Sequence, residues 1–348
     1  MNWWKKLKTN RLAQFGAILL ILFYVVAIGA NFFAPYDPYA SQPNGSLLPP
    51  TQVYLRHQQT GEWIGPHVYP TTQGPVSLET GERKIEVDFS QPSGIRLLHR
   101  DDGGQLHLFD TAGEGKWNIL GTDEQARDQF SRLIYGSRVS LFVGLIGIAI
   151  SFPLGMLVGG IAGYFGGAVD AVLMRFVEVI MTIPGIYLLV ALAGVLPAGL
   201  SSSQRFMLII LITSLIGWAG LARVIRGQVL SIKEQEFVQA SRVMGGRPFY
   251  IITRHVLPQT ATYGIIAATL AIPSFILAEA VLSFIGLGIQ QPDASWGNML
   301  SISTNASILV LQPWLVWPPA ILIVVTSLAF NLLGDGLRDA LDPRTLEE

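Results

Sequence analysis

The sequence predicts an all-α integral membrane protein with six transmembrane helices and a small β-rich insert. Half of its 348 residues are hydrophobic and only 14% are charged, whereas soluble domains carry about 25% charged residues. Several windows contain no Asp, Glu, Lys or Arg, and most reach the roughly 20 residues that a membrane-spanning helix needs. The spans are expected near residues 13–34, 138–163, 172–197, 206–226, 260–288 and 313–335.

The first span is either an uncleaved helix or the core of a cleaved signal peptide. It follows a basic start made of Lys5, Lys6, Lys8 and Arg11. The apolar run is longer than the roughly 7–15 residues of a signal-peptide core, and no convincing small-residue cleavage site follows it. We therefore expect an uncleaved span. The chain has no cysteine, which excludes disulfides, thiol chemistry and cysteine-ligated metal sites.

The charge distribution predicts which loops face the cytoplasm. Residues 223–255 carry six Lys or Arg against two acids, whereas residues 34–132 carry eight against thirteen acids. Basic loops stay inside, so both termini are expected to be cytoplasmic. The expected parts are a cytoplasmic N-terminus (1–12), a first span (13–34), an extracytoplasmic subdomain (35–132), a membrane core (138–344) with a cytoplasmic loop (227–259), and a cytoplasmic tail (345–348).

The segment 35–132 is too long for an ordinary loop, and its pattern is that of β-structure. Ile85, Val87 and Phe89 alternate with acidic residues, which is the period of a strand. Two hairpins are expected, with residues 53–58 and 62–64 around Thr60-Gly61 and residues 95–100 and 105–109 around 101–104. The sequence therefore predicts a small β-rich subdomain.

Helix breakers lie inside the apolar runs. The prolines are Pro153, Pro184, Pro273 and the pair Pro318-Pro319, and the glycines of the second span are Gly144, Gly147, Gly155, Gly159, Gly160 and Gly163. Breaks in lipid survive where protein or a cavity surrounds the freed backbone groups. Glycines also let helices pack closely, whereas the prolines are candidates for bending in an alternating-access gate.

The stretch from Gln239 to Pro258 is polar and basic, although apolar spans flank it. We expect a short helix over residues 235–245 that ends at Gly245-Gly246. Its candidate docking residues share one face, and they are Phe237, Ala240, Ser241 and Met244. Small and apolar side chains on one face suit docking in a partner's groove. The alternative is an amphipathic helix that lies on anionic lipid.

This stretch resembles the EAA loop of ABC importer permeases. The likeness rests on Gln239, Ala240, Ser241, Gly245, His255 and Pro258. Gln239 stands where the family usually has glutamate, Ser241 where it has alanine, and His255 where it has isoleucine. In that family the loop forms a short cytoplasmic helix that docks in a cleft of a separate ATPase subunit.

Further motifs extend the resemblance over most of residues 119–344. They are similar to motifs of dipeptide, oligopeptide and nickel permeases. They read GTDEQARDQFSRLIYGSR at 121–138, GYFGG at 163–167, WAGLARVIRGQVLSIK at 218–233, LSFIGLG at 282–288 and NLLGDGLRDALDPR at 331–344.

The resemblance implies a type I ABC importer permease fold and the C-type permease subunit of a peptide importer in the bacterial cell inner membrane. The implied partners are a second homologous permease, two ABC ATPase subunits and an extracytoplasmic solute-binding protein. The ATPase subunits would bind ATP and Mg, and this chain is expected to hold no cofactor, metal or catalytic residue. The cargo stays open among peptides, nickel chelates, glutathione and peptide antibiotics.

Acidic residues at membrane depth leave a second function open. Glu279 either lines a pathway or makes a structural hydrogen bond, and Glu178 and Asp335 are expected in interhelical pairs. The alternative function is a proton-coupled secondary transporter that uses these acids as a relay. The chain has no G-x-x-x-x-G-K-[ST], H-E-x-x-H or G-x-S-x-G motif, so neither ATP binding nor hydrolase chemistry is indicated. Its basic loop alone does not indicate nucleic-acid binding.

Overall fold

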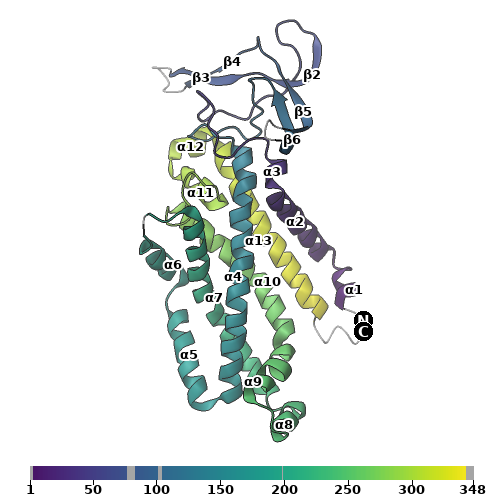
Figure 1. Ribbon diagram of the computed structural model, residues 1–348, viewed down its shortest axis with the longest axis vertical. Coiled ribbons are helices and arrows are strands. Elements are labelled where there is room, and N and C mark those ends of the chain that lie inside the picture. Colours follow the sequence, from purple (N-terminus) through teal and green to yellow (C-terminus); the bar gives the residue numbers. More distant parts are fainter. Residues whose placement is uncertain (1–2, 77–82, 101–103, 198, 342–348) are drawn as a thin grey trace. The chain divides into compact units, whose positions relative to one another are not determined.

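The computed structural model describes residues 3–76, 83–100, 104–197 and 199–341 (Figure 1). The described chain is mostly helical, as the charge-free windows predict. Its helices are α1 (Trp3–Leu7), α2 (Arg11–Ile28), α3 (Ala30–Phe33), α4 (Gln129–Phe165), α5 (Gly167–Thr182), α6 (Gly185–Gly194), α7 (Ser202–Ile232), α8 (Glu236–Val243), α9 (Pro248–Ile251), the π-helical turn η1 (Ile252–Val256), α10 (Leu257–Phe284), α11 (Trp296–Leu300), the 3-10 turn η2 (Ser301–Thr304), α12 (Ala306–Leu311) and α13 (Pro313–Leu341).

Within the described residues, five continuous helical runs are long and apolar enough to cross a membrane. They are Arg11–Ile28, Gln129–Phe165, Ser202–Ile232, Pro248–Phe284 and Pro313–Leu341. These runs correspond to the first, second, fourth, fifth and sixth expected spans. Most of them extend beyond the charge-free windows, because a helix can continue into polar sequence once it leaves the apolar layer.

The span expected near residues 172–197 is not one continuous helix. That region is split into α5 and α6, which are bent by 83° relative to each other. Ile183 between them is extended, and Pro184 precedes Gly185. Proline lacks a backbone donor and disfavours the helical conformation of the residue before it. The described helices therefore give five crossings, or six if the bent pair is one broken span.

The chain forms two compact units. Unit 1 comprises Met1–Ile21, Phe142–Leu282 and Val324–Glu348, and unit 2 comprises Leu22–Leu141 and Ser283–Ile323.

In unit 1, glycines allow α4 to approach α7 closely. A Cβ on Gly159 would lie 2.4 Å from the carbonyl oxygen of Ala222, and a Cβ on Gly163 would lie 2.7 Å from the Cβ of Val229. Gly155 faces Leu221 in the same way, so the three glycines, spaced four residues apart, form one helix face. This is the small-residue packing that lets helix backbones approach in membranes. It confirms the packing interpretation of these three glycines.

Unit 2 contains the strands that the sequence predicts. Four strands form one sheet in the order β1-β2-β5-β6, and β3 and β4 form a separate two-stranded sheet. Each of these pairings is antiparallel. The strands are β1 (Tyr54–Arg56), β2 (Trp63–Val68), β3 (Thr71–Val76), β4 (Arg83–Val87), β5 (Ser93–Arg100) and β6 (Leu106–Ala112). Both expected hairpins form, and the glycine at the first turn, Gly61, has a φ of +72°. Residues 101–103 of the second turn lie outside the described residues.

Candidate functional site

Helix α8 forms where the sequence predicts a short helix, between α7 and α10. It begins after Gln235 and ends at Val243, followed by Met244. The Gly246 amide donates to the Ser241 carbonyl at 3.0 Å, and the Gly245 amide donates to the Arg242 carbonyl at 3.1 Å. Gly245 has a φ of +82°. This closing pair of hydrogen bonds requires a left-handed residue, which explains glycine at position 245.

The inward face of α8 packs into an apolar core of unit 1. Val238 is 1% exposed and packs in one cluster with residues of α4, α7, α9, η1 and α10. The buried members of that cluster are Met156, Ile225, Val229, Val238, Ile251 and Val256. Ser241, three residues after Val238, is also buried, at 7% exposure. The prediction that Ser241 lies on the docking face is therefore wrong, because it shares the inward face with Val238.

The outward face of α8 is apolar and highly exposed. Phe237 is 41% exposed, Val243 87% and Met244 81%, and Ala240 is exposed between them. Phe249 and Tyr250 in α9 add further exposed aromatic surface, at 65% and 54%. We call these five large side chains the apolar docking face. Of the five, only Phe237 and Met244 were expected from the sequence, although Val243 follows from the three-residue spacing after Ala240.

Gln239 lies beside this face and contacts the end of α7. Its side-chain amide donates to the carbonyl of Lys233 at 2.9 Å and to a carboxylate oxygen of Glu234 at 3.4 Å. The carbonyl of Lys233 lies at the C-terminal end of α7, where carbonyls lack helical partners. A glutamine can donate this bond and a glutamate cannot. The departure from the family's glutamate at this position thus has a local structural role.

His255 and Pro258 lie where the loop joins α10. His255 is in the π-helical turn η1, and its ring packs edge-on against Tyr250 with centroids 5.5 Å apart. The turn closes with a hydrogen bond from the Leu257 amide to the Ile252 carbonyl. Pro258 follows at once in α10, inside the continuous helical run Pro248–Phe284, so its missing backbone donor leaves that run one hydrogen bond short beside the π-helical turn.

Polar contacts tie this region to the long helices of unit 1. The Lys233 ammonium donates to the carbonyl of Gly163 at the end of α4, at 3.0 Å. On α7, Arg226 forms a two-point ion pair with Asp170 of α5, with distances of 3.0 and 2.5 Å. In Figure 1, α5 and α7 lie side by side. Glu178, which is expected from the sequence in an interhelical pair, instead pairs with Arg175 on the same helix α5, at 3.1 Å.

The expected gating residues are spread over unit 1. Pro153 and Pro273 lie inside the continuous helices α4 and α10, whereas Pro184 separates α5 from α6. Glu279 on α10 is 0% exposed and has an interaction partner within the chain. Its complete burial favours the structural role over the pathway-lining role in this conformation.

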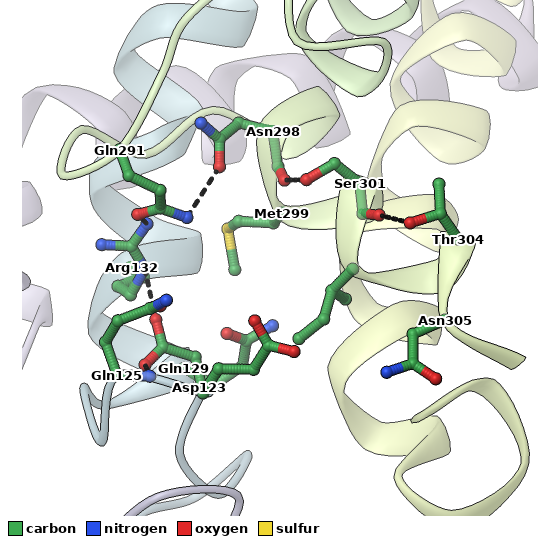
Figure 2. A pocket seen from close by; sticks show the side chains of 12 residues that line it. Asp123, Gln125, Gln129, Arg132, Gln291, Asn298, Met299, Ser301, Thr304 and Asn305 are labelled. Atoms are coloured by element: carbon green, nitrogen blue, oxygen red, sulfur yellow. Dashed lines mark hydrogen bonds and ion pairs between the residues drawn. The ribbon is translucent and has the colours of Figure 1, made fainter. Parts of the chain in front are cut away.

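Unit 2 contains a polar cavity of about 250 Å³ (Figure 2). It lies among the loop before α4, the start of α4 and the segment from Gln291 to Asn305. On one side of the cavity, Asp123 forms ion pairs with Arg127 at 2.6 Å and with Arg132 at 3.3 Å. Arg132 also donates to Gln291 at 3.0 Å. These buried ion pairs belong to the motif at 121–138, and sequence reasoning did not identify their role.

The hydrogen bonds around this cavity are mostly internal. The Gln291 amide donates to Asn298 (Figure 2). Asn298 in turn donates to the Ile289 carbonyl. Gln129 donates to the Leu315 carbonyl at 2.9 Å. Satisfied polar networks of this kind rigidify a fold. The cavity lining therefore serves mainly to hold the segment after α10 against the segment before α4.

Comparison with known proteins shows what the chain is similar to. Residues 153–347 match the family described as "Binding-protein-dependent transport system inner membrane component", and residues 2–50 match "N-terminal TM domain of oligopeptide transport permease C". The dipeptide transport system permease protein DppC of Bacillus subtilis is 34% identical over 341 residues, which is 98% of this chain and 84% of that protein.

Oligopeptide permeases show a similar degree of identity. The oligopeptide transport system permease protein OppC of Haemophilus influenzae is 40% identical over 228 residues, which is 66% of this chain and 71% of that protein. OppC of Escherichia coli is 40% identical over 227 residues, which is 65% of this chain and 72% of that protein.

Proposed function

The chain belongs to the family of binding-protein-dependent transport system inner membrane components, and we propose that it is the permease subunit of an ATP-driven peptide importer. It is a multi-pass inner membrane protein, and its curated relatives transport dipeptides and oligopeptides by name. In this proposal the chain forms half of the translocation pathway, and a separate ATPase drives it. Peptides of the dipeptide or oligopeptide class are the cargo.

The apolar docking face is the observation that carries this proposal. Val243 and Met244 leave more than four fifths of their surface exposed, although the helix that bears them is polar. The inward residue Val238 anchors the same helix in the core of unit 1. A short helix that is fixed on one side and apolar on the other suits insertion into a groove of a partner.

The proposed assembly has three kinds of partner protein around this chain. A second homologous permease completes the pathway within the lipid bilayer, and two ABC ATPase subunits bind ATP and Mg. An extracytoplasmic solute-binding protein delivers cargo to the outer side of the membrane. Residues 227–259 and both termini face the cytoplasm, and residues 35–132 lie outside. ATP binding draws the ATPase subunits together, the docked helix α8 moves with them, and the spans turn from inward-facing to outward-facing.

Family membership does not favour the proton-coupled alternative. Two of its three relay acids are exposed, since the Glu178 side chain is 48% exposed and already paired with Arg175, and Asp335 is exposed. A relay needs acids within proton-transfer reach of one another along the pathway. Uptake by the reconstituted complex distinguishes the two functions. ATP-dependent uptake that survives a proton uncoupler supports the importer, and uptake by this chain alone on a pH gradient would support the alternative.

The docking face is tested by the double substitution Val243→Glu and Met244→Glu. Both side chains are exposed, so the chain is expected to stay folded while the ATPase subunits no longer co-purify with it. Gln235→Glu is the matched control, because it adds a negative charge to the same helix at its exposed N-cap. Gly245 is less suitable, since its φ of +82° strains any side chain. Retention of the ATPase by the double variant would overturn the docking assignment.

A further inference from the structure

Docking alone does not explain how motion of α8 reaches the membrane helices. A docked helix transmits force only where contacts hold it to those helices. Val238 gives an apolar contact that holds α8 in the core, but apolar attraction has no preferred direction. Hydrogen bonds have defined length and direction, so polar ties between α8 and the long helices are the better candidates for transmission.

Two hydrogen bonds meet at Lys233 and connect α8 to α4. The Gln239 amide on α8 donates to the Lys233 carbonyl at 2.9 Å. The Lys233 ammonium donates to the Gly163 carbonyl of α4 at 3.0 Å. One residue at the C-terminal end of α7 thus joins the short helix to a second membrane helix.

The position of Gly163 explains why this contact is possible. Gly163 lies in the last turn of α4, whose final carbonyls have no helical donor. The Ala162 carbonyl accepts from Gly166, so the neighbouring carbonyl is satisfied locally. A cation at a helix C-terminus is also favoured by the helix dipole. Because Gly163 has no side chain, α7 packs close to α4 at this point. The Lys233 ammonium can therefore contact the Gly163 carbonyl.

We propose that Lys233 is a positioning residue that transmits movement of α8 to α4, and so couples ATP hydrolysis to transport. The proposal rests on the proposed function, because it assigns a role within that mechanism. Lys233 touches neither nucleotide nor cargo. It makes α8, the end of α7 and the end of α4 move together when the ATPase closes.

The alternative is that Lys233 only caps α4 and stabilises the fold. A purely stabilising role would lower the yield or the thermal stability of the protein but would leave the amount of peptide imported per ATP unchanged. A transmitting role predicts the reverse, namely an assembled complex that hydrolyses ATP without matching uptake. The ratio of uptake to hydrolysis therefore separates the two roles.

The test uses the complete complex with its partner subunits and binding protein in liposomes. The cargo is a defined mixture of di- to pentapeptides, and uptake is read by mass spectrometry. Lys233→Met keeps an unbranched side chain of similar length and removes the ammonium group that donates to Gly163. We expect co-purification and ATP hydrolysis to be retained while uptake per ATP falls about tenfold, a common size for coupling between sites. Lys233→Arg should restore most of the uptake, and Lys6→Met controls for the loss of one positive charge elsewhere.

Each other result overturns the proposal. Wild-type coupling in Lys233→Met would show that the contact with Gly163 transmits nothing. Loss of assembly in Lys233→Met, or failure of Lys233→Arg to restore coupling, would assign the residue to stability or docking. If the wild-type complex itself imports none of the peptides with ATP, the proposed function fails, and that outcome is read before any variant is compared.

Discussion

Arg226 on α7 and Asp170 on α5 form a two-point ion pair across 56 positions of sequence. The Nε–Oδ1 distance is 3.0 Å and the Nη2–Oδ2 distance is 2.5 Å. The side chains are 36% and 14% exposed. Such fork-shaped arginine–carboxylate contacts are directional as well as strong. The pair thus fixes how α5 packs against α7, beside the apolar cluster that contains Val177 and Trp218.

Asp170→Asn tests the weight of this pair. The amide keeps the shape of the carboxylate but removes its charge, and hydrogen bonds to charged groups contribute about 2 kcal/mol. We expect a clearly lower thermal unfolding midpoint of the purified chain in detergent. Glu178→Gln is the control, because its pair with Arg175 is 80% and 48% exposed and such pairs contribute at most about 1 kcal/mol. Equal shifts in the two variants would contradict the prediction.

Gly159→Ala tests the close approach of α4 to α7. The new methyl group would lie 2.4 Å from the Ala222 carbonyl oxygen, a backbone atom that cannot turn away. Overpacking of this kind costs about 1–3 kcal/mol, so the unfolding midpoint should fall. Gly227→Ala on α7 is the matched control, since nothing lies within 4 Å of its Cβ position and alanine favours a helix by about 1 kcal/mol over glycine. A fall of the same size in both variants would refute the packing explanation.

The sequence predicts the helices better than their interruptions. Absence of charge over long windows identifies five of the six expected spans as continuous helices. Three prolines lie in similar apolar surroundings, yet only Pro184 ends a helix, and Pro153 and Pro273 do not. Pro184 differs in being followed by Gly185, which also weakens a helix. Both α5 and α6 are apolar on average, so the pattern of apolar residues does not reveal the break between them.

The candidate site was predictable where it depends on local sequence. Gly245 ends α8 as expected, because its left-handed conformation is a local requirement. The inward position of Ser241 follows from its three-residue spacing to Val238, a pattern that the sequence analysis did not use. The contacts of Lys233 with Gly163 and of Arg226 with Asp170 join positions 70 and 56 residues apart. Only the packing of α4, α5 and α7 brings these residues together.

Asp128 gives unit 2 a predicted dependence on pH. Burial raises the pKa of its carboxyl from 3.8 to about 6, although a hydrogen bond from the Ser131 amide opposes the shift. A raised pKa means that the folded state binds the proton more tightly, so stability falls as pH rises from about 4 to about 6. The shift of about two pKa units corresponds to about 3 kcal/mol.

Asp128→Asn should therefore stabilise the protein at pH 7.5 and change little at pH 4. Asparagine still accepts the Ser131 amide but carries no charge. Unfolding midpoints of variant and wild type across this range measure the difference. Asp88→Asn is the control: hydrogen bonds from Ser90 lower the pKa of this exposed carboxyl, so its charge does not change over most of the range. An Asp128→Asn curve parallel to wild type would contradict the assignment.

Gln239→Glu restores the residue that related permeases usually carry, and we expect it to weaken the attachment of α8 in this chain. The carboxylate cannot donate to the Lys233 carbonyl, and it would face the carboxylate of Glu234, which lies 3.4 Å from the present amide. A buried or half-buried acceptor left without its donor costs about 1–3 kcal/mol. Hydrogen exchange of the α8 amides should therefore accelerate. Gln235→Glu adds the same charge at the N-cap of α8, where the helix dipole favours it, so that variant should exchange no faster than wild type. Protection of α8 in Gln239→Glu equal to that of the control would show that the amide of Gln239 does not hold the helix.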